Sequence, residues 1–336
     1  MKTRIGLAGC GSHALNRIVP LLQAHAELEL VAVWARKAQT QALLHERGIK
    51  GVYGDFDEFL AQDIDVVYIA SPTGCHFAHA AAVLRAGKHV WVEKPLACTL
   101  AETRTLVELA DRSKLMLAEA FMFTWHAQAA AIRQALAQDV IGAPRLASFT
   151  FCFPHLQADN FRYDPALGGG AWLDHACYLV KALVFYFGGE WTLLGGCLEH
   201  DGYAVDVRGA AQLRRVSDGM LAQLAWGFGH GYVNEMQVVG ERGRMLVESA
   251  FTKPATRACD ITLEDSRGAQ SRIAVPPENP FARMLDGLTR QLRDSTGWPA
   301  LRHELIAHAE RFFALRAQLH GGSNAKLAPQ VTAHER

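Results

Sequence analysis

The sequence has no excess of charge of either sign and no long apolar run, and each absence excludes a class of protein. Lysine and arginine together number 34, as do aspartate and glutamate, so the formal net charge is zero. Runs of like charge are also missing, so nothing directs the chain to nucleic acid or to an anionic membrane surface. No stretch approaches the roughly 18 consecutive apolar residues that a membrane span needs. We therefore expect neither a nucleic-acid partner nor a membrane partner.

Cysteines are few and scattered, which argues against a disulfide framework and against a zinc site. The seven cysteines, an odd number, stand at positions 10, 75, 98, 152, 177, 197 and 259, without a CxxC pair. This pattern indicates a reducing compartment. Leu7-Ala8-Gly9-Cys10 looks like a lipoprotein cleavage site, but a signal sequence needs about 7–15 apolar residues and only Ile5 to Ala8 is available. We predict a strand here and, without a targeting segment, a cytoplasmic location.

The stretch around Lys94 organises the chain. A short apolar strand, His89 to Val92, ends abruptly in Glu93-Lys94-Pro95. Upstream, the apolar run 65–70 predicts a buried parallel strand, and His76 to Ala86 predicts the helix that connects the two strands. Ligands of such βαβ sheets bind beyond the carboxyl ends of the strands, so Lys94 is a candidate catalytic group. The alternative is a surface lysine in a solvated turn.

A glycine pattern follows the first predicted strand, Arg4 to Ala8. The segment Gly9-Cys10-Gly11-Ser12-His13-Ala14 reads G-x-G-x-x-A and opens a helix that we expect to run through Gln23. Gly9 and Gly11 would let the backbone approach a pyrophosphate, and the free N–H groups at Ser12 and His13 would face the phosphates. This setting predicts a dinucleotide-binding domain.

The next predicted strand, Leu28 to Trp34, lacks the acidic residue that usually holds the ribose hydroxyls of NAD. It is followed by Ala35-Arg36-Lys37 instead. Arg36 could bind a 2′-phosphate through charge-assisted hydrogen bonds, with Lys37 beside it. The alternative is an ordinary basic helix start. We predict NADP as the cofactor, with NAD less favoured.

The residues after the strand 65–70 complete the predicted cofactor site. We expect Ser71, Pro72 and Thr73 to line it, together with His76 near the nicotinamide. His76 and His79 share a helix face, as a metal pair would, but no third ligand is apparent. We predict no metal.

From residue 121 the order of the predicted strands and helices changes. Strands follow one another without intervening helices, which indicates an antiparallel or mixed sheet and an α+β domain. We predict these strands at 145–154, 193–200, 205–213, 220–228, 235–239, 245–248 and 260–263. The length of 336 residues and this change divide the chain into a dinucleotide-binding domain (1–120), a substrate and oligomerisation domain (121–320) and a loose tail (321–336).

One predicted helix, Ala171 to Phe187, interrupts the strands and carries a second cluster. Asp174 and Tyr178 are four residues apart and share a face, whereas His175 is rotated by about 100°. A buried Asp and Tyr could be a satisfied core pair. Next to Lys94, however, the tyrosine would gain a role, because a cation stabilises phenolate and lowers the phenol pKa.

Four segments together resemble the glucose–fructose oxidoreductase/inositol dehydrogenase (Gfo/Idh/MocA) family of nicotinamide-dependent oxidoreductases. They are AGCGSHA, YIASPTGCHFAHAAAVLRAGKHVWVEKPLACT, AEAFMFTWHAQ and RYDPALGGGAWLDHACY. The resemblance covers nearly the whole chain. It implies a Rossmann domain followed by an α+β domain built on an open, mostly antiparallel sheet, which often forms a subunit interface.

The resemblance also implies roles for particular residues. In the branch with tyrosine on the GGGA helix, similar to dimeric dihydrodiol dehydrogenases and sugar ketoreductases, Lys94 and Tyr178 would be the catalytic groups and Asp174 would support them. The cofactor set then includes Glu93 and also Lys94, whose ammonium would orient the nicotinamide ribose. The substrate contacts are Arg162, His175 and Phe121. The chain departs from the family pattern at several positions, namely His175, Ala176, Thr124 and Ala127, which bears on substrate identity more than on chemistry.

The sequence thus predicts an NADP(H)-dependent oxidoreductase that moves hydride between nicotinamide and a secondary alcohol or ketone. The expected substrate is a sugar, a nucleotide-linked keto sugar or a similar polyol, and the expected assembly is a homodimer or homotetramer. Two alternatives stay open. The fold could use bound nicotinamide for transient redox in elimination or glycoside cleavage, or it could serve as a non-catalytic NADP(H) sensor.

Overall fold

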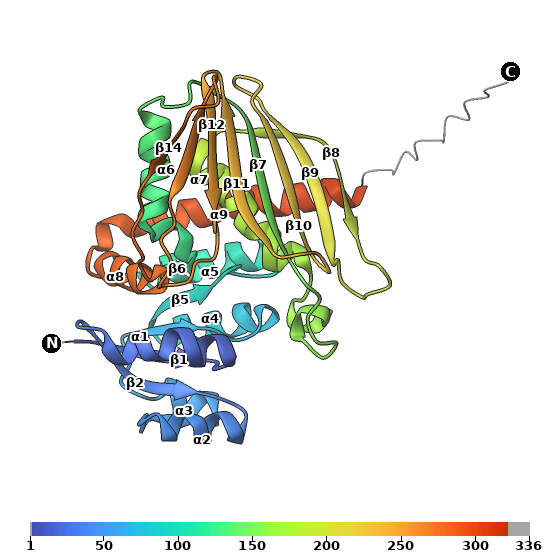
Figure 1. Cartoon of the computed structure of the whole chain (residues 1–336). Helices are drawn as coiled ribbons and strands as arrows, with labels where there is room; N and C mark the ends of the chain where they lie inside the picture. The colour runs from blue at the N-terminus through green and yellow to red at the C-terminus, as the bar shows by residue number, and fades with distance from the viewer. Residues whose placement is uncertain (1, 322–336) are drawn as a thin grey trace, which may run out of the picture.

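Two β-sheets and the helices packed on them make up the protein (Figure 1). The computed structural model describes residues 2–321. The predicted loose tail, 321–336, lies outside the described residues except for Gly321, where the last helix ends. No helix in the described part of the chain has the length and apolar character needed to cross a membrane.

The first sheet has six parallel strands in the order β3-β2-β1-β4-β5-β6. Its strands are β1 (Thr3–Ala8), β2 (Leu28–Trp34), β3 (Val52–Tyr53), β4 (Val66–Ile69), β5 (His89–Glu93) and β6 (Leu117–Ala120). The helices between them are α1 (Val19–Ala24), α2 (Ala38–Glu46), α3 (Phe56–Leu60), α4 (His76–Arg85) and α5 (Leu100–Arg112). This is the predicted doubly wound α/β arrangement.

The register of this sheet brings the predicted site residues together. Ala8 pairs with Trp34 on one side and with Ile69 on the other, and Ile69 pairs with Val92. The carboxyl ends of these strands therefore lie in one row, and ligands of open α/β sheets bind beyond such a row. Strand β4 is buried along its whole length, so packing on both faces of the sheet holds it in this position.

The second sheet has eight strands in the order β14-β13-β12-β11-β7-β10-β9-β8. Its strands are β7 (Pro144–Phe153), β8 (Trp191–Glu199), β9 (Arg208–Arg215), β10 (Leu221–Phe228), β11 (Val233–Gly240), β12 (Gly243–Glu248), β13 (Ile261–Asp265) and β14 (Gln270–Ile273). All neighbours are antiparallel except β7 and β10, which are parallel. The expectation of a mixed, mostly antiparallel sheet is confirmed.

Four helices accompany the second sheet: α6 (Ala127–Ala137), α7 (Cys177–Phe187), α8 (Pro280–Arg293) and α9 (Trp298–Gly321). In Figure 1 the strands stand in front of α7 and α9, and α9 runs across the back of the sheet. The same helix contacts α5 and β6 of the first sheet. Helix α9 therefore packs on both sheets.

Several predicted boundaries are wrong, two of them for a local reason that the structure shows. The last strand of the first sheet, predicted from Lys114, begins at Leu117, because Lys114 occupies a turn with φ +53°. The strand predicted at 205–213 runs from Arg208 to Arg215, since Asp206 is used to hold the start of a helix. The final helix begins at Trp298 instead of 303. Helix α8 and strand β14 were not predicted.

Candidate active site

The ammonium group of Lys94 connects the end of β5 to the helix that carries Asp174 and Tyr178. The residue follows β5, and its Nζ donates to the backbone carbonyl of Asp174 at 2.8 Å and to Asp174 Oδ1 at 2.9 Å. Nζ also lies 4.6 Å from the centroid of the Tyr178 ring, within the range of a cation–π contact. The three residues predicted to act together are therefore in contact, and Lys94 is not a surface lysine.

Asp174 serves as counter-ion to two cations. Its Oδ2 accepts from Arg162 Nε at 2.6 Å, while Oδ1 holds Lys94. Burial alone would raise the pKa of Asp174, but Arg162 and Lys94 together hold it well below its usual range. Burial would likewise lower the pKa of Lys94, yet Asp174 and its other neighbours raise it. The carboxylate and the ammonium are thus both charged at neutral pH.

Tyr178 is buried, and its hydroxyl has only a weak partner. The hydroxyl donates to Met122 Sδ at 3.7 Å, and the edges of Phe121 and Phe151 pack against the ring. Burial raises the pKa of Tyr178 and outweighs the opposite effect of Lys94. The predicted fall of this pKa toward neutrality is therefore wrong: Lys94 lies over the ring face, and the phenol keeps its proton.

The helix that carries Asp174 and Tyr178 starts with a π-helical turn, Trp172–Ala176, before α7. Asp206 organises this start: its Oδ2 accepts from the Trp172 amide at 2.6 Å, and its carbonyl accepts from the Ala171 amide. A side chain at Gly170, where φ is +113°, would collide with the same carboxylate. Sequence reasoning missed Asp206, since it lies in a loop 32 positions after Asp174 with no motif around it.

The glycine turn has the shape that a pyrophosphate needs. Gly9 has φ +88°, and a Cβ there would lie 2.7 Å from the Ser71 amide nitrogen, so only glycine fits between the two loops. A Cβ at Gly11 would meet no atom within 4 Å, so the backbone there is open to a ligand. Ser12 and His13 are exposed at the same turn. These residues fit a dinucleotide.

Glu93, the last residue of β5, contacts both the neighbouring strand β4 and the glycine turn. Its Oε1 accepts from Tyr68 Oη at 2.7 Å and lies 3.4 Å from His13 Nε2. Burial would raise the pKa of Glu93, but His13, Tyr68 and Lys94 together lower it. Tyr68 was missed, because a tyrosine inside a buried strand carries no signal beyond packing.

The loop after β4 is held from inside by His76. Its Nδ1 lies 2.8 Å from the Pro95 carbonyl and its Nε2 lies 2.9 Å from the Ser71 carbonyl. His76 is 1% exposed, so both nitrogens face protein groups. Pro72 and Thr73 are partly exposed on the same loop. The structure places His76 as a tie between two loops, and its contact with a cofactor stays a prediction.

Arg36 and Lys37 lie beyond β2 and are both exposed. Arg36 is separated from the Lys94 cluster by the β1 and β4 strand ends. This placement matches the adenosine end of a dinucleotide whose pyrophosphate lies at Gly9 and Gly11. The predicted role for the 2′-phosphate fits this position.

The three predicted substrate residues have different surroundings. Arg162 is partly exposed and bound to Asp174. His175 and Phe121 are only 1% and 2% exposed, so their direct contact with a substrate stays a prediction. Glu119, not predicted, accepts from the Leu96 amide at 2.8 Å and so holds the loop that follows Lys94. Its segment, AEAFMF, was noted without a role for the glutamate.

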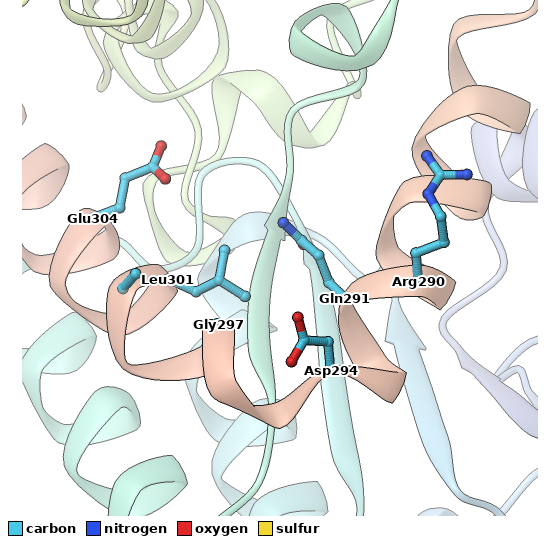
Figure 2. A pocket seen from close by; sticks show the side chains of 7 residues that line it. Arg290, Gln291, Asp294, Gly297, Leu301 and Glu304 are labelled. Carbon is cyan, nitrogen blue, oxygen red and sulfur yellow. The ribbon is translucent and has the colours of Figure 1, made fainter.

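Two adjoining cavities lie away from Lys94. One, of about 390 Å³, is bounded by α8, α9 and the turn between them, with Arg290 and Glu304 at opposite ends (Figure 2). The other, of about 240 Å³, lies between β6, α7, α8 and α9. Of the predicted site residues only Phe121 lines either cavity. The side-chain geometry around Lys94, and not these cavities, identifies the candidate site.

Nowhere in residues 2–321 do three or more His, Cys, Asp or Glu side chains gather as a metal site would need. His79, the partner in the HxxH pair, has its Nδ1 2.9 Å from Ser71 Oγ.

Family models match both parts of the chain. Residues 3–121 match the model described as "Oxidoreductase family, NAD-binding Rossmann fold", and residues 129–246 match the GFO/IDH/MocA C-terminal domain. The two matches flank the segment between β6 and α6. The resemblance seen in the sequence motifs is confirmed.

Relatives of known activity resemble the chain over most of its length. It is 35% identical to a dTDP-3,4-didehydro-2,6-dideoxy-α-D-glucose 3-reductase of Saccharopolyspora spinosa, covering 88% of this chain and 89% of that one. It is 30% identical to D-xylose 1-dehydrogenase (NADP(+)) 2 of Haloferax volcanii, covering 85% and 87%. A solved structure of the 3-ketoreductase KijD10 from Actinomadura kijaniata, in complex with NADP and TDP-benzene, matches with a TM-score of 0.88 and 29% identity over 94% and 98% of the chains.

Proposed function

The chain belongs to the GFO/IDH/MocA family of oxidoreductases with an NAD-binding Rossmann fold, and we propose that it uses NADPH to reduce the keto group of a sugar, preferably a nucleotide-linked keto sugar. One observation carries the proposal: Asp174 holds Lys94 against Tyr178. The similarity to dTDP-keto-sugar 3-reductases and to an NADP-bound 3-ketoreductase supports the substrate and the cofactor.

The residues of the glycine turn would hold the cofactor. Gly9 and Gly11 let the backbone approach the pyrophosphate, and the exposed helix start at Ser12 offers N–H groups and a positive dipole end. Arg36 and Lys37 would bind the 2′-phosphate, and Glu93, Ser71 and Thr73 would line the nicotinamide half of the cofactor. When bound, the reduced nicotinamide supplies the hydride.

Lys94 would bind the carbonyl oxygen of the substrate. An ammonium has three N–H donors, and Asp174 takes two of them, which leaves one for a substrate oxygen. Because its pKa is raised, Lys94 stays charged as negative charge develops on that oxygen. Asp174 keeps the ammonium in place without taking its proton.

Tyr178 would supply the proton. As hydride adds to the carbonyl carbon, the C=O π bond breaks and the oxygen takes the proton of the Tyr178 hydroxyl. The raised pKa keeps that proton on the phenol until the stronger base, the developing alkoxide, forms. The thioether of Met122 is a weak acceptor, so a substrate oxygen can replace it.

Arg162 would face the rest of the substrate. One of its five N–H donors binds Asp174, and the others are free to bind hydroxyl or phosphate oxygens. Its partial exposure gives it access to solvent on the substrate side.

The direct test is oxidation of NADPH with a panel of dTDP-linked keto sugars, free keto sugars and aldoses. We expect turnover with a keto sugar, matched by an equal amount of alcohol product. An enzyme that uses none of the panel, but reduces another class of ketone or oxidises another class of secondary alcohol, would contradict the substrate assignment.

The proton donor is tested by Tyr178→Phe. The substitution removes only the hydroxyl, so we expect kcat to fall by at least about 10²-fold while the Kd for NADPH stays unchanged. Turnover near that of the wild type would move the proton-donating role to another group.

We also propose that the protein works in the cytoplasm as a homodimer or homotetramer. All seven cysteines are free thiols, which supports a reducing compartment. The strands of the second sheet have helices on one face, and the opposite face is available to a second copy (Figure 1). Light scattering coupled to size-exclusion chromatography would give the mass of the assembly, and a monomer at micromolar concentration would contradict the proposal.

A further inference from the structure

His175 is a buried histidine whose ring nitrogens have no hydrogen-bond partner. The residue is 1% exposed, and both Nδ1 and Nε2 are buried and unpaired within residues 2–321. Buried polar atoms of side chains are nearly always satisfied, so an exception needs an explanation. The nearest charged atom lies on the active-site side, where Nε2 is 3.5 Å from Asp174 Oδ2.

Three phenylalanines fix the orientation of the ring. The centroid of His175 lies 4.5 Å from that of Phe151, 4.1 Å from that of Phe153 and 5.0 Å from that of Phe228. Two of these contacts are edge-to-face, with interplanar angles of 82° and 78°. The ring cannot turn without displacing an aromatic neighbour, so Nε2 stays at its position 3.5 Å from Asp174 Oδ2.

The imidazole is neutral at physiological pH. Burial lowers its pKa to about 3. Asp174 acts in the opposite direction and raises this pKa, whereas the cations Lys94 and Arg162 lower it further. A neutral ring carries one N–H. On Nε2 this N–H faces the carboxylate, whereas on Nδ1 it would leave a nitrogen lone pair facing the negative charge. The Nε2–H form is therefore favoured.

Asp174 needs such a contact, because its carboxylate has to hold two cations at once. Oδ1 binds Lys94 and Oδ2 binds Arg162. The terminal torsion of an aspartate is soft, and Arg162, on the other side of the carboxylate, is partly exposed on the proposed substrate side. A rotation of the carboxylate would move Lys94 away from Tyr178. Displacements of about 1 Å at a catalytic group cost up to about 10² in rate.

We propose that His175 is a positioning residue: its Nε2–H fixes the carboxylate of Asp174 and thereby holds Lys94 at Tyr178. The inference rests on the proposed function, since it assigns His175 a role in that reaction. This role also explains why a histidine occupies a position surrounded by phenylalanines. An apolar side chain would pack there without leaving Nδ1 unpaired, so fold stability gives no reason for a histidine.

The test compares three variants: His175→Leu, His175→Gln and His175→Asn. The Leu variant should lose about tenfold in kcat with the Kd for NADPH unchanged and the Tm equal or higher. Gln places its amide nitrogen where Nε2 stands and should restore kcat to within about threefold, whereas Asn mimics Nδ1 and should not. A Leu variant with wild-type kcat, or equal kcat values for Gln and Asn, would overturn the proposal.

A second measurement needs no substrate. In protein labelled with ¹⁵N-histidine, the signal of His175, assigned by its loss in His175→Gln, should report a neutral ring protonated on Nε2 from pH 6 to pH 8. A ring protonated on Nδ1, or a cation, would overturn the proposal whatever the turnover. If the wild type reduced no keto sugar, that result would count against the proposed function. The tautomer measurement would still test the contact between His175 and Asp174.

Discussion

The two ends of the candidate site are built differently. At the substrate end, every charged group has a protein partner: Lys94 and Arg162 share Asp174, and the Lys94 side chain is 11% exposed. At the cofactor end, Arg36 and Lys37 are exposed, and the Gly11 backbone faces open space. One end is organised by the protein itself, and the other presents groups that a ligand would organise.

The difference follows from what each end is proposed to do. Catalytic charges lose rate when they move, so they are held by fixed counter-ions in a region that excludes water. Groups that bind phosphates gain their energy from the anion that they meet, so exposed arginine and free backbone amides are sufficient. Substitutions at the substrate end should therefore lower kcat and leave cofactor binding unchanged, whereas substitutions at the cofactor end should do the reverse.

The largest effect is expected for Lys94→Met. The change removes the ammonium but keeps most of the side-chain volume, and Asp174 remains paired with Arg162. We expect kcat to fall by about 10²–10⁴-fold, with NADPH still bound. Lys181→Met is the matched control, because Lys181 is an equally buried lysine paired with Glu304 outside the cluster. Equal losses in the two variants would indicate damage to the fold instead.

A smaller effect is expected at the cofactor end for Arg36→Ala. Loss of the guanidinium should weaken NADPH binding by tenfold or more, about 1.4 kcal/mol, and leave both NADH binding and kcat at saturating cofactor unchanged. Fluorescence titrations with the two cofactors measure this, and Arg85→Ala, at an exposed position in α4, serves as the control. Equal Kd values of the wild type for NADPH and NADH would reduce Arg36 to a surface charge.

The smallest effect concerns stability and comes from Glu119, which holds the loop after Lys94. Burial raises its pKa from 4.5 to about 7. The unfolded chain ionises this carboxyl more readily, so the folded protein loses stability as pH rises from about 4.5 to about 7. We expect Glu119→Gln to abolish this loss. The free energy of unfolding of the variant, relative to that of the wild type, should therefore increase by at least about 1 kcal/mol from pH 5 to pH 8. Urea unfolding at both pH values measures it; a constant difference would contradict the assigned pKa.

Local sequence signals predicted much of the fold. Asp55 caps α3, and Thr99 and Glu102 form the predicted capping box of α5. Both are contacts between near neighbours, and their spacing encodes them. The same holds for the glycine turn after β1. Helix α8 was missed although Asn279 and Pro280 stand at its start and its buried apolar residues recur at helical spacing, at Phe281, Met284, Leu285 and Leu288. The sequence therefore did contain the signal for this helix.

At the site, helical spacing put Asp174 and Tyr178 on one face, and the family resemblance placed Lys94 beside them, but neither gave their electrostatics. The pKa of Tyr178 depends on burial by Phe121 and Phe151, which come from distant segments. The role of Asp206 likewise depends on a contact between a loop and a helix start. Such effects arise from tertiary packing, which a linear pattern does not contain.

The most direct test of the proposed function follows the label of deuterated NADPH. The protein is mixed with a dTDP-linked keto sugar and with NADPH that carries deuterium at the transferable C4 position. The masses of the products are then measured by mass spectrometry. Net reduction by the Lys94 and Tyr178 pair predicts one deuterium on the carbinol carbon of the sugar for each NADP⁺ formed. A sugar product without deuterium, formed with no net oxidation of NADPH, would contradict the account and support transient redox at a bound nicotinamide.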